Sequence, residues 1–415
     1  MSANHDSPDF WDYGEEKEDL IHRIHSYPAK FPAFITTKAL QYAERKGVEV
    51  KTIADVFCGC GTTAVEAKKN GKNFWGCDIN PVATLIAQVK TRRYKKPILE
   101  KYFSSIIKAF VSINVDEAET ARINSRIKYW FEEENIDALF RLNKAINQEI
   151  PNNSLYKKFF LCAFSNILKP TSKWLTKSIK AQIDPNKPHH DVMQAFEKQF
   201  ALMIKANDEG AFSENDKANI LITSRNFLSI QSKKYRADLI VTSPPYVTSY
   251  DYAEIHQLSA LWLDYVTDYR NLRKNMVGNS YGIEVPSEFD IEHLPAPGGD
   301  IYKALYKEDK AKARATIRYF IDISKAVAKC QTILNQNGMI IFVMGNTEYR
   351  GVKIDNVAFL RNCMESCGLQ GVEIIPRKMS MKALTPYRDS IGRFTKHAGQ
   401  RRVYAKEAVL IGRKA

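Results

Sequence analysis

Residues 52–78 constrain the fold of this chain more than any other segment. Residues 52–57 form a short apolar run that is typical of a buried strand, and the turn Cys58-Gly-Cys-Gly61 follows it directly. Residues 62–70 fit a helix, and residues 73–77 fit a second strand that runs into Asp78. This order of strand, turn, helix and strand predicts the opening of a parallel α/β sheet.

The alternation of strands and helices is interrupted twice farther along the chain. Residues 96–214 have helical periodicity, and residues 265–315 are irregular and rich in Gly, Pro and Asn. We therefore expect an α/β fold: a Rossmann-like sheet with helices on both faces, plus a largely helical insertion. The expected parts are residues 1–95 (N-terminal segment and first half of the core), 96–214 (helical insertion), 215–264 (core), 265–315 (irregular insertion) and 316–415 (C-terminal part of the core).

Further elements are expected within these parts. The periodicity predicts helices over residues 35–46, 315–334 and 356–367, and strands over residues 219–222, 238–241, 339–344, 372–375 and 403–411.

The glycine turn and the acid after the second strand together predict a nucleoside site. Gly59 and Gly61 allow a ligand to approach the backbone closely, and the following helix offers free N–H groups to a carboxylate. Asp78 lies 23 residues after Asp55, where a nucleotide-binding α/β fold places the carboxylate that accepts hydrogen bonds from ribose hydroxyls. The turn lacks the third glycine that would admit a pyrophosphate, which disfavours a dinucleotide. A tight strand–helix connection without a ligand is the structural alternative.

The cysteines and histidines do not predict a metal site. Cys58 and Cys60 have no second cysteine pair and no histidine near them in the sequence. A thiolate that attacks a pyrimidine ring usually sits in a Pro-Cys loop, and no such dipeptide occurs in the chain. His189 and His190 fit a solvated loop pair better than a metal site. We predict no metal.

The segment Ser243-Pro244-Pro245-Tyr246 carries the most specific chemistry. It follows an apolar strand, and its two prolines remove backbone donors and fix the direction of the carbonyls. An exocyclic base amine is a poor nucleophile because its lone pair is delocalised into the ring. The Ser243 hydroxyl and the Pro244 carbonyl would hold the amine hydrogens and free that lone pair, while Tyr246 offers a face on which the base stacks. The alternative is a Pro-Pro turn with a tyrosine in the core.

The two motifs together resemble the DNA amino-methyltransferases, which make N4-methylcytosine or N6-methyladenine with S-adenosylmethionine as cofactor. The family's cofactor loop matches the turn after the first strand, its ribose acid matches Asp78, and its catalytic tetrapeptide matches Ser243 to Tyr246. The segment from His25 to Pro32 is similar to the family's cofactor-covering segment. The resemblance thus implies that the cofactor-binding residues are Pro28, Ala29, Lys30, Asp55, Phe57, Cys58, Gly59, Gly61, Thr62, Thr63, Asp78, Asn80 and Ser224.

Two positions refine the resemblance. Thr223-Ser224-Arg225 stands where many relatives carry an acid that contacts the cofactor adenine, so Ser224 would replace that acid. Serine at position 243 resembles the cytosine-N4 enzymes, whereas the adenine enzymes usually have Asp or Asn. The expected reaction is therefore site-specific methylation of a flipped cytosine at N4, with adenine N6 as the alternative.

The charge of the chain is consistent with a polyanionic partner. The formal net charge is +14, and each phosphate that a protein neutralises releases counterions. Residues 157–190 contain seven lysines against one acid, interleaved with Phe159, Phe160, Phe164 and Trp174, and residues 377–402 contain eight Lys or Arg against one acid. We expect phosphate clamps here, although solvated faces are what most charge runs form. We hypothesise that residues 96–214 and 265–315 read the target.

Several other classes are excluded or kept as alternatives. The chain has no run of eighteen apolar residues, which excludes a membrane span, and its seven scattered cysteines favour a reducing, prokaryotic cytoplasm. Double-stranded DNA is the expected partner, with a cognate restriction endonuclease if the enzyme belongs to a restriction-modification system, and the oligomeric state is left open. The alternatives are methylation of RNA or of a protein amide, and a non-catalytic nucleic-acid-binding protein.

Overall fold

The computed structural model describes most of the 415-residue chain. The described residues are 9–12, 17–28, 30, 32–116, 119, 122–209, 217–247, 250–278, 287, 291–378, 387–388, 394–395, 401–402 and 406–415.

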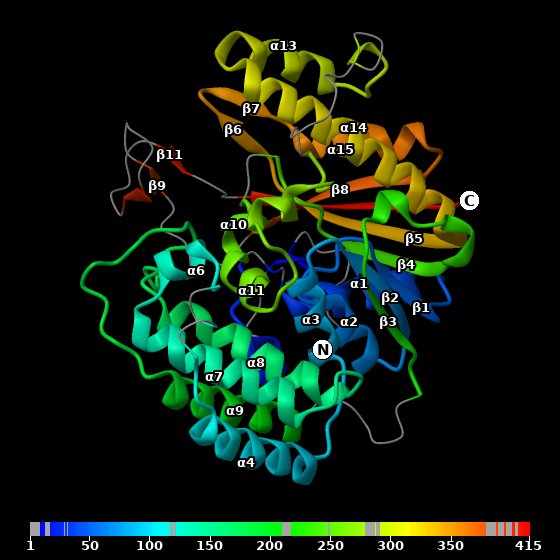
Figure 1. Cartoon of the computed structure of the whole chain (residues 1–415). Helices are drawn as coiled ribbons and strands as arrows, with labels where there is room; N and C mark the ends of the chain where they lie inside the picture. Colours follow the sequence, from blue (N-terminus) through cyan, green and yellow to red (C-terminus); the bar gives the residue numbers. More distant parts are fainter. Residues whose placement is uncertain are drawn as a thin grey trace.

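A seven-stranded sheet forms the centre of the molecule (Figure 1), in the order β3-β2-β1-β4-β5-β12-β8. Strands β1 to β5 pair in parallel, whereas β12 is antiparallel to both β5 and β8. The sheet confirms the predicted Rossmann-like α/β fold. Its strands are β1 (Thr52–Asp55), β2 (Asn73–Asp78), β3 (Ile220–Ser224), β4 (Ala237–Thr242), β5 (Leu334–Met344), β8 (Gln370–Lys378) and β12 (Lys406–Arg413).

Helices cover both faces of the sheet, because successive strand residues point to opposite sides. In β4, Leu239 and Val241 pack in one core, whereas Ile240 packs in the other. The core that contains Leu239 takes up side chains of α1 (Ala33–Arg45), α2 (Thr62–Lys69) and α3 (Pro81–Lys90). The core that contains Ile240 takes up side chains of α13 (Gly298–Glu308), α14 (Lys310–Ile333) and α15 (Asn356–Ser366).

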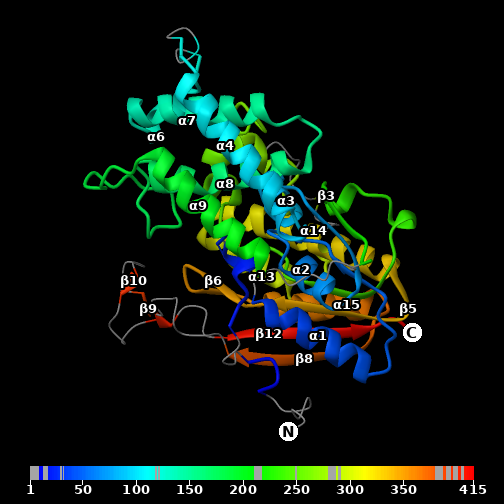
Figure 2. The ribbon, with the colours of Figure 1, turned by 90° about the horizontal axis from the view of Figure 1, so that it is seen from below.

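The predicted helical insertion is confirmed, and it lies on the opposite side of the molecule from α13 and α14 (Figures 1 and 2). It contains α4 (Lys96–Ser112), α6 (Ser125–Trp130), α7 (Glu133–Glu149), α8 (Leu155–Thr171) and α9 (Val192–Asp208). Its side chains form one continuous core with α3 and with α11 (Gln257–Trp262), which follows α10 (Tyr252–Ile255). The insertion is therefore packed into the main body rather than set apart from it.

The structure differs from the sequence prediction over residues 265–315. This stretch was expected to be irregular, yet it contains α13, and α14 begins at Lys310, ahead of the predicted start. Prolines and glycines suggested a loop here, but they mark the start of α13: Pro297 is its N-cap and Gly298 is its first residue. Ile301 and Leu305 then give α13 a buried face at i, i+4 spacing.

The remaining elements are short. They are η1 (Leu20–Arg23), η2 (Phe227–Ser229), η3 (Ser232–Lys234), η4 (Tyr269–Arg273), the pair β6 (Thr347–Tyr349) and β7 (Val352–Ile354), and the three-stranded sheet of β9 (Tyr387–Arg388), β10 (Phe394–Thr395) and β11 (Arg401–Arg402). The predicted basic run 377–402 and the start of the predicted strand 403–411 fall largely outside the described residues. Among the described helices, all are too short or too polar to cross a lipid bilayer.

Candidate active site

The carboxyl ends of β1 and β4 bring the two sequence motifs together. These strands are neighbours in the sheet. The sheet continues from β1 to β2 and β3 on one side, and from β4 to β5 on the other. Ligands of open α/β sheets bind at such a switch point. The glycine turn follows β1 directly, and Ser243 follows β4 directly. The cofactor loop and the catalytic loop that the sequence predicts therefore lie at the same edge of the sheet.

Asp55 joins the two loops. One of its carboxylate oxygens accepts a hydrogen bond from the Thr242 hydroxyl at 2.6 Å, and the other accepts one from the Thr63 hydroxyl at 2.8 Å. The backbone N–H of Phe57 donates to it as well, at 3.1 Å. Burial raises the pKa of Asp55 to about 6, although these hydrogen bonds act in the opposite direction. Asp55 is 1% exposed, so it holds the two loops together through these hydrogen bonds and does not line the surface of the site.

The two glycines of the turn have different reasons to be glycine. Gly61 has φ +80°, and a Cβ there would lie 2.6 Å from the Cβ of Ala87 in α3. Gly59 has φ +47°, and the hydroxyl oxygen of Tyr27 would lie 3.4 Å from a Cβ at this position. Gly61 thus permits close packing of α3, whereas Gly59 is favoured by its positive φ.

Asp78 lies at the end of β2, beside the turn. Its carboxylate accepts the backbone N–H of Gly59 at 2.9 Å and that of Asn80 at 2.8 Å. Burial raises its pKa, while the two backbone donors lower it. Ser224 pairs with Asp78 in the register of β2 and β3, and it is exposed. Asp78 and Ser224 are therefore neighbours at the open edge of the sheet.

Two buried polar atoms in this region have no partner among the described residues. They are the hydroxyl oxygen of Thr62 and the side-chain nitrogen of Asn80. Thr62 is the first residue of α2, and Asn80 caps α3 by accepting the N–H of Val82 at 3.0 Å. Buried polar groups are usually hydrogen-bonded, so both atoms fit a ligand with polar groups at this edge. The residues around the turn thus suit a nucleoside with an amino-acid tail, as S-adenosylmethionine is.

The segment before α1 covers the turn through an aromatic stack. The ring of Tyr27 stacks on His256 at a centroid distance of 5.1 Å and on Tyr252 at 6.2 Å. Burial and the charge of Asp78 raise the pKa of Tyr27, whereas burial lowers the pKa of His256 to about 4. We did not single out Tyr27 from the sequence, although it directly precedes the predicted Pro28.

The other residues predicted for the cofactor divide into three groups. Cys58 and Thr63 are buried beneath the turn, and Phe57 packs edge-on against Phe227. Pro28 is half-buried, while the Lys30 amine binds Glu18 at 2.7 Å and the His22 carbonyl at 2.8 Å. Ala29 lies outside the described residues.

The loop predicted to be catalytic has a defined hydrogen bond at its first residue, Ser243. The Ser243 hydroxyl donates to the Val343 carbonyl of β5 at 3.0 Å. This bond uses the only hydrogen of the hydroxyl and leaves its oxygen with lone pairs that can accept. Pro244 is buried and Pro245 half-buried.

Tyr246 is hydrogen-bonded to the antiparallel part of the sheet. Its hydroxyl donates to Glu407 of β12 at 2.9 Å, and Glu407 forms an ion pair with Arg377 of β8. Burial and the Glu407 carboxylate raise the pKa of Tyr246. Sequence reasoning missed Glu407 and Arg377, because their partner is far away in the chain and nothing local distinguishes them from surface charges.

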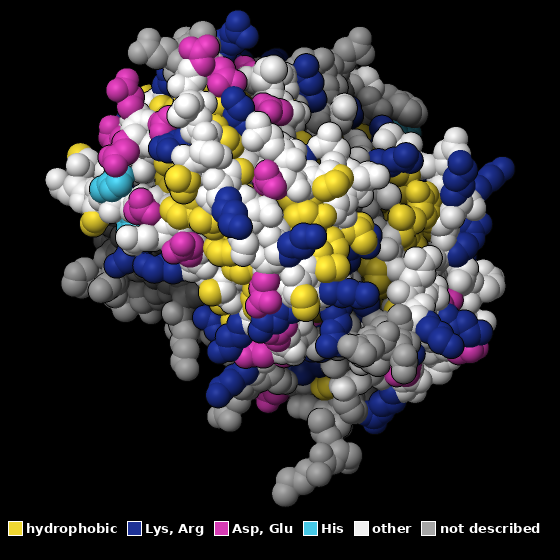
Figure 3. Space-filling view, turned by 60° about the horizontal axis from the view of Figure 1, so that its bottom comes forward, with side chains coloured by type: hydrophobic (Ala, Val, Ile, Leu, Met, Phe, Trp, Pro, Cys, Tyr) yellow, Lys and Arg dark blue, Asp and Glu magenta, His cyan; other side chains and the backbone are white. Residues whose placement is uncertain are grey.

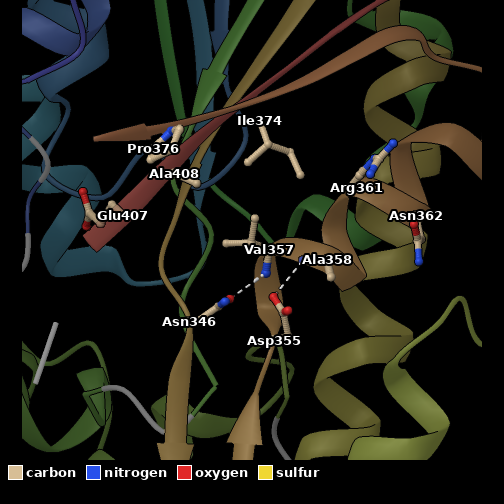
Figure 4. Close-up of a pocket in the computed structure, with 10 residues that line it drawn as sticks. All are labelled: Asn346, Asp355, Val357, Ala358, Arg361, Asn362, Ile374, Pro376, Glu407 and Ala408. Atoms are coloured by element: carbon tan, nitrogen blue, oxygen red, sulfur yellow. Dashed lines mark hydrogen bonds between the residues drawn. The ribbon is translucent and has the colours of Figure 1, made fainter. Parts of the chain in front are cut away.

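A pocket of about 560 Å³ opens beside Glu407, between α15 and strands β8 and β12 (Figure 4). Its floor contains Val357, Ile374, Pro376 and Ala408, and its polar rim contains Asn346, Asp355, Arg361, Asn362 and Glu407. The side chains of Asn346 and Asp355 are engaged with backbone N–H groups at the start of α15.

The aromatic residues interleaved with the lysines of residues 157–190 belong to the core, so the phosphate clamp predicted there would rest on the lysines alone. Phe159, Phe160, Phe164 and Trp174 are at most 2% exposed and belong to the core, so they cannot stack on bases. Lys169 and Lys187 donate to backbone carbonyls within the same segment. Figure 3 shows Lys and Arg side chains interspersed with acidic and apolar ones on the face it presents, rather than a uniform basic surface.

The described residues also bear on the metal prediction. They contain no group of three or more His, Cys, Asp or Glu side chains that could hold a metal ion. Cys58 and Cys60 are buried as free thiols.

Comparisons with known proteins point to one family. Residues 3–89 match a family model described as DNA methylase, which covers the N6 and N4 types. The chain is 22% identical to the Type II methyltransferase M.MvaI of Kocuria varians over 391 residues, which is 88% of this chain and 86% of the relative. It is 35% identical to the Type II methyltransferase M.MjaII of Methanocaldococcus jannaschii over 88 residues, or 21% of this chain and 16% of that protein.

Among solved structures, the chain aligns with the rRNA methyltransferase aviRa of Streptomyces viridochromogenes. The TM-score is 0.30 at 9% identity, with 95% of this chain and 90% of the other covered. A score this low carries no functional argument. The sequence matches confirm the predicted resemblance to the DNA amino-methyltransferases, the class that acts on cytosine N4 or adenine N6.

Proposed function

We propose that this enzyme transfers a methyl group from S-adenosylmethionine to N4 of a cytosine that is flipped out of duplex DNA. One observation carries the proposal. The Ser243 hydroxyl directly follows β4 and donates its hydrogen to the Val343 carbonyl, which leaves lone pairs on its oxygen that can accept. An acceptor at this position suits an amine that must lose electron delocalisation into its ring before it attacks.

The catalytic loop would act by holding the amine. Ser243 and the Pro244 carbonyl accept its two hydrogens and draw the nitrogen towards tetrahedral geometry. Because both prolines lack an N–H, no backbone donor of theirs competes for the lone pair that must attack. The ring of Tyr246 would stack on the extruded base, and stacking on an aromatic side chain contributes roughly 1–3 kcal/mol per base. Rate enhancement then comes from orientation and electrostatic placement, without a covalent enzyme intermediate.

The turn after β1 would bind the cofactor, which supplies an electrophilic methyl group on a sulfonium. Asp78 is the residue that would accept hydrogen bonds from the ribose hydroxyls. The unpaired Thr62 hydroxyl and Asn80 amide would contribute further polar contacts. Ser224, exposed beside Asp78, would contact the adenine edge. Phe57 would contribute to the wall of this site.

Duplex DNA is the proposed substrate because the family model that matches residues 3–89 is described as DNA methylase. A cognate restriction endonuclease would then be a further partner. Residues 96–214 and 265–315 would read the bases. In the second range, η4 contacts α10, which follows the catalytic loop in the sequence (Figure 1).

The test is the chemical identity of the product. Purified enzyme is incubated with S-adenosylmethionine and plasmid DNA from a host that lacks DNA methyltransferases, and the nucleosides are separated by mass spectrometry. We expect N4-methyldeoxycytidine. N6-methyldeoxyadenosine would overturn the choice of base, and methylation of RNA but not of DNA would overturn the substrate.

A variant connects the product to the loop. Ser243→Ala should lower turnover by orders of magnitude and leave the affinity for S-adenosylmethionine within about twofold. The matched control is Ser229→Ala, which removes a hydroxyl that bonds the Asn226 carbonyl at 2.9 Å in η2. Equal turnover of Ser243→Ala and the wild type would contradict the role of the hydroxyl.

A further inference from the structure

Glu407 contacts the catalytic tyrosine although it is far from it in the sequence. It is the second residue of β12, and one of its carboxylate oxygens accepts the Tyr246 hydroxyl at 2.9 Å. The two residues are separated by 161 positions, so the tertiary fold brings them together. Figure 4 shows Glu407 on β12 at one end of the pocket, away from Arg361 and Asn362 at the other.

The carboxylate is itself held in place. Its second oxygen pairs with a terminal nitrogen of the Arg377 guanidinium. Arg377 is 3% exposed, and its Nε donates to the Trp11 carbonyl at 3.2 Å. The arginine therefore has fixed partners on two sides, and the carboxylate keeps one oxygen for Arg377 and the other for Tyr246.

The hydrogen bond restrains the tyrosine ring at its far end. The near end is restrained by the backbone, because Tyr246 follows two prolines. A tyrosine side chain has two torsions that set the plane of its ring, and anchoring the hydroxyl limits both. An aromatic surface on which a base must stack in one orientation benefits from such restraint, since misplacement of a substrate lowers the rate.

We propose that Glu407 is a positioning residue, which fixes the ring of Tyr246 for the incoming base and is itself oriented by Arg377. The inference rests on the proposed function, in which Tyr246 stacks on the flipped cytosine. Glu407 does not touch the reacting atoms in this account and acts only through the tyrosine hydroxyl.

The charge of Glu407 matters as well as its shape. A hydrogen bond to an ionised acceptor is about twice as strong as one between neutral groups. In Glu407→Gln, the amide oxygen would accept from Arg377, and the amide nitrogen would donate to the oxygen of the Tyr246 hydroxyl. The glutamine has nearly the same volume as the glutamate, but it replaces the charged acceptor of Tyr246 with a neutral donor.

The experiment is a double-mutant cycle on methyl transfer. The variants are Tyr246→Phe, Glu407→Gln and the two combined, and the assay follows tritiated methyl from S-adenosylmethionine into unmethylated plasmid DNA. Tyr246→Phe should lower kcat about ten- to hundredfold, the range of a hydrogen bond to a charged group. Glu407→Gln should lower kcat by a smaller factor, because a neutral hydrogen bond replaces the charged one. The double variant should be no slower than the slower single variant, because Glu407 has no route to the base once the tyrosine hydroxyl is gone.

Two further measurements separate positioning from a general structural effect. The dissociation constant for S-adenosylmethionine, by calorimetry, should stay within about twofold in all variants. Tyr349→Phe is the matched control, since Tyr349 also donates to a carboxylate, Asp309, at 2.7 Å, and its kcat should be unchanged. Tyr246→Phe leaves the Glu407–Arg377 pair intact, so it tests the inference even where Glu407→Gln proves too unstable to assay.

The outcomes are distinct. Full kcat in Tyr246→Phe, or multiplicative losses in the double variant, would overturn the role of Glu407 while the proposed function stands. A wild-type enzyme that transfers no methyl group to DNA would overturn the proposed function, and the positioning role would fall with it.

Discussion

Replacing Asp55 with Asn should change the pH dependence of stability in a predictable direction. The carboxylate of Asp55 is almost fully buried and accepts three hydrogen bonds, from Thr63, Thr242 and Phe57. Burial outweighs these bonds, so the pKa of Asp55 is raised to about 6 in the folded protein from its ordinary value of 3.8. The folded state therefore binds the proton more tightly than the unfolded state does.

The sign and size of the effect follow from this difference. A raised pKa in the folded state means that stability is greatest below about pH 3.8 and is lost as the pH rises through about 6. A shift of roughly two units corresponds to about 3 kcal/mol at pH 7. About half of this, roughly 1.4 kcal/mol, develops between pH 5 and pH 8, where the folded protein can be studied.

The assay is urea unfolding of the wild type and of Asp55→Asn at several pH values between 5 and 8. The free energy of unfolding of the wild type relative to the variant should fall by about 1.4 kcal/mol over this range. Asp238→Asn is the control, since Asp238 accepts two backbone N–H groups at the opposite end of β4. A difference between wild type and Asp55→Asn that does not vary with pH would refute the reasoning.

Other predictions concern the turn and the ribose acid. Asp78→Ala removes the acceptor for the N–H groups of Gly59 and Asn80, and it should weaken S-adenosylmethionine binding about tenfold or more by calorimetry; unchanged affinity would contradict the assignment. Gly61→Ala should destabilise the fold by about 2–4 kcal/mol, because its Cβ would meet the backbone of Ala87 at 2.8 Å and φ is +80°. Gly47→Ala has the same φ and open space around it, so thermal unfolding should show a cost of only about 1 kcal/mol, and equal costs at both positions would contradict the packing argument.

The opening of the fold was predictable because its signals are local. The turn after β1, the helix beginning at Thr62 and the acid Asp78 all depend on neighbours within a few residues, and the structure has β1, α2 and β2 within one or two residues of their predicted bounds. The predicted catalytic loop also rests on a local signal, because two consecutive prolines restrict the backbone in any structural context.

What the sequence could not predict depends on long-range contacts. Phe160 and Phe164 stand among lysines in the sequence, but their i, i+4 spacing places both on the buried face of α8. Asp55 was predicted among the cofactor-binding residues, and its hydrogen bond to Thr242 exists only because the fold brings the two residues together. Glu407 had no sequence signal at all for the same reason.

The core that encloses the helical insertion implies that the insertion cannot be removed as a unit. His25 bonds the Ser165 hydroxyl of α8 at 3.0 Å, and Ser165 in turn bonds Ser259 of α11 at 2.7 Å. One chain of hydrogen bonds thus links the cofactor-covering segment, the insertion and the helix that follows the catalytic loop.

Replacing residues 96–214 with a short linker would expose the apolar faces of α3 and α11 together. We therefore expect the truncated protein to lose measurable S-adenosylmethionine binding and cooperative thermal unfolding, rather than to become an enzyme without sequence specificity. Mutating only the exposed Tyr129 on α6, which is 49% exposed, should leave both properties intact and serves as the control. A truncated protein that binds the cofactor with wild-type affinity would mean that the insertion is peripheral, contrary to the continuous core that joins it to α3.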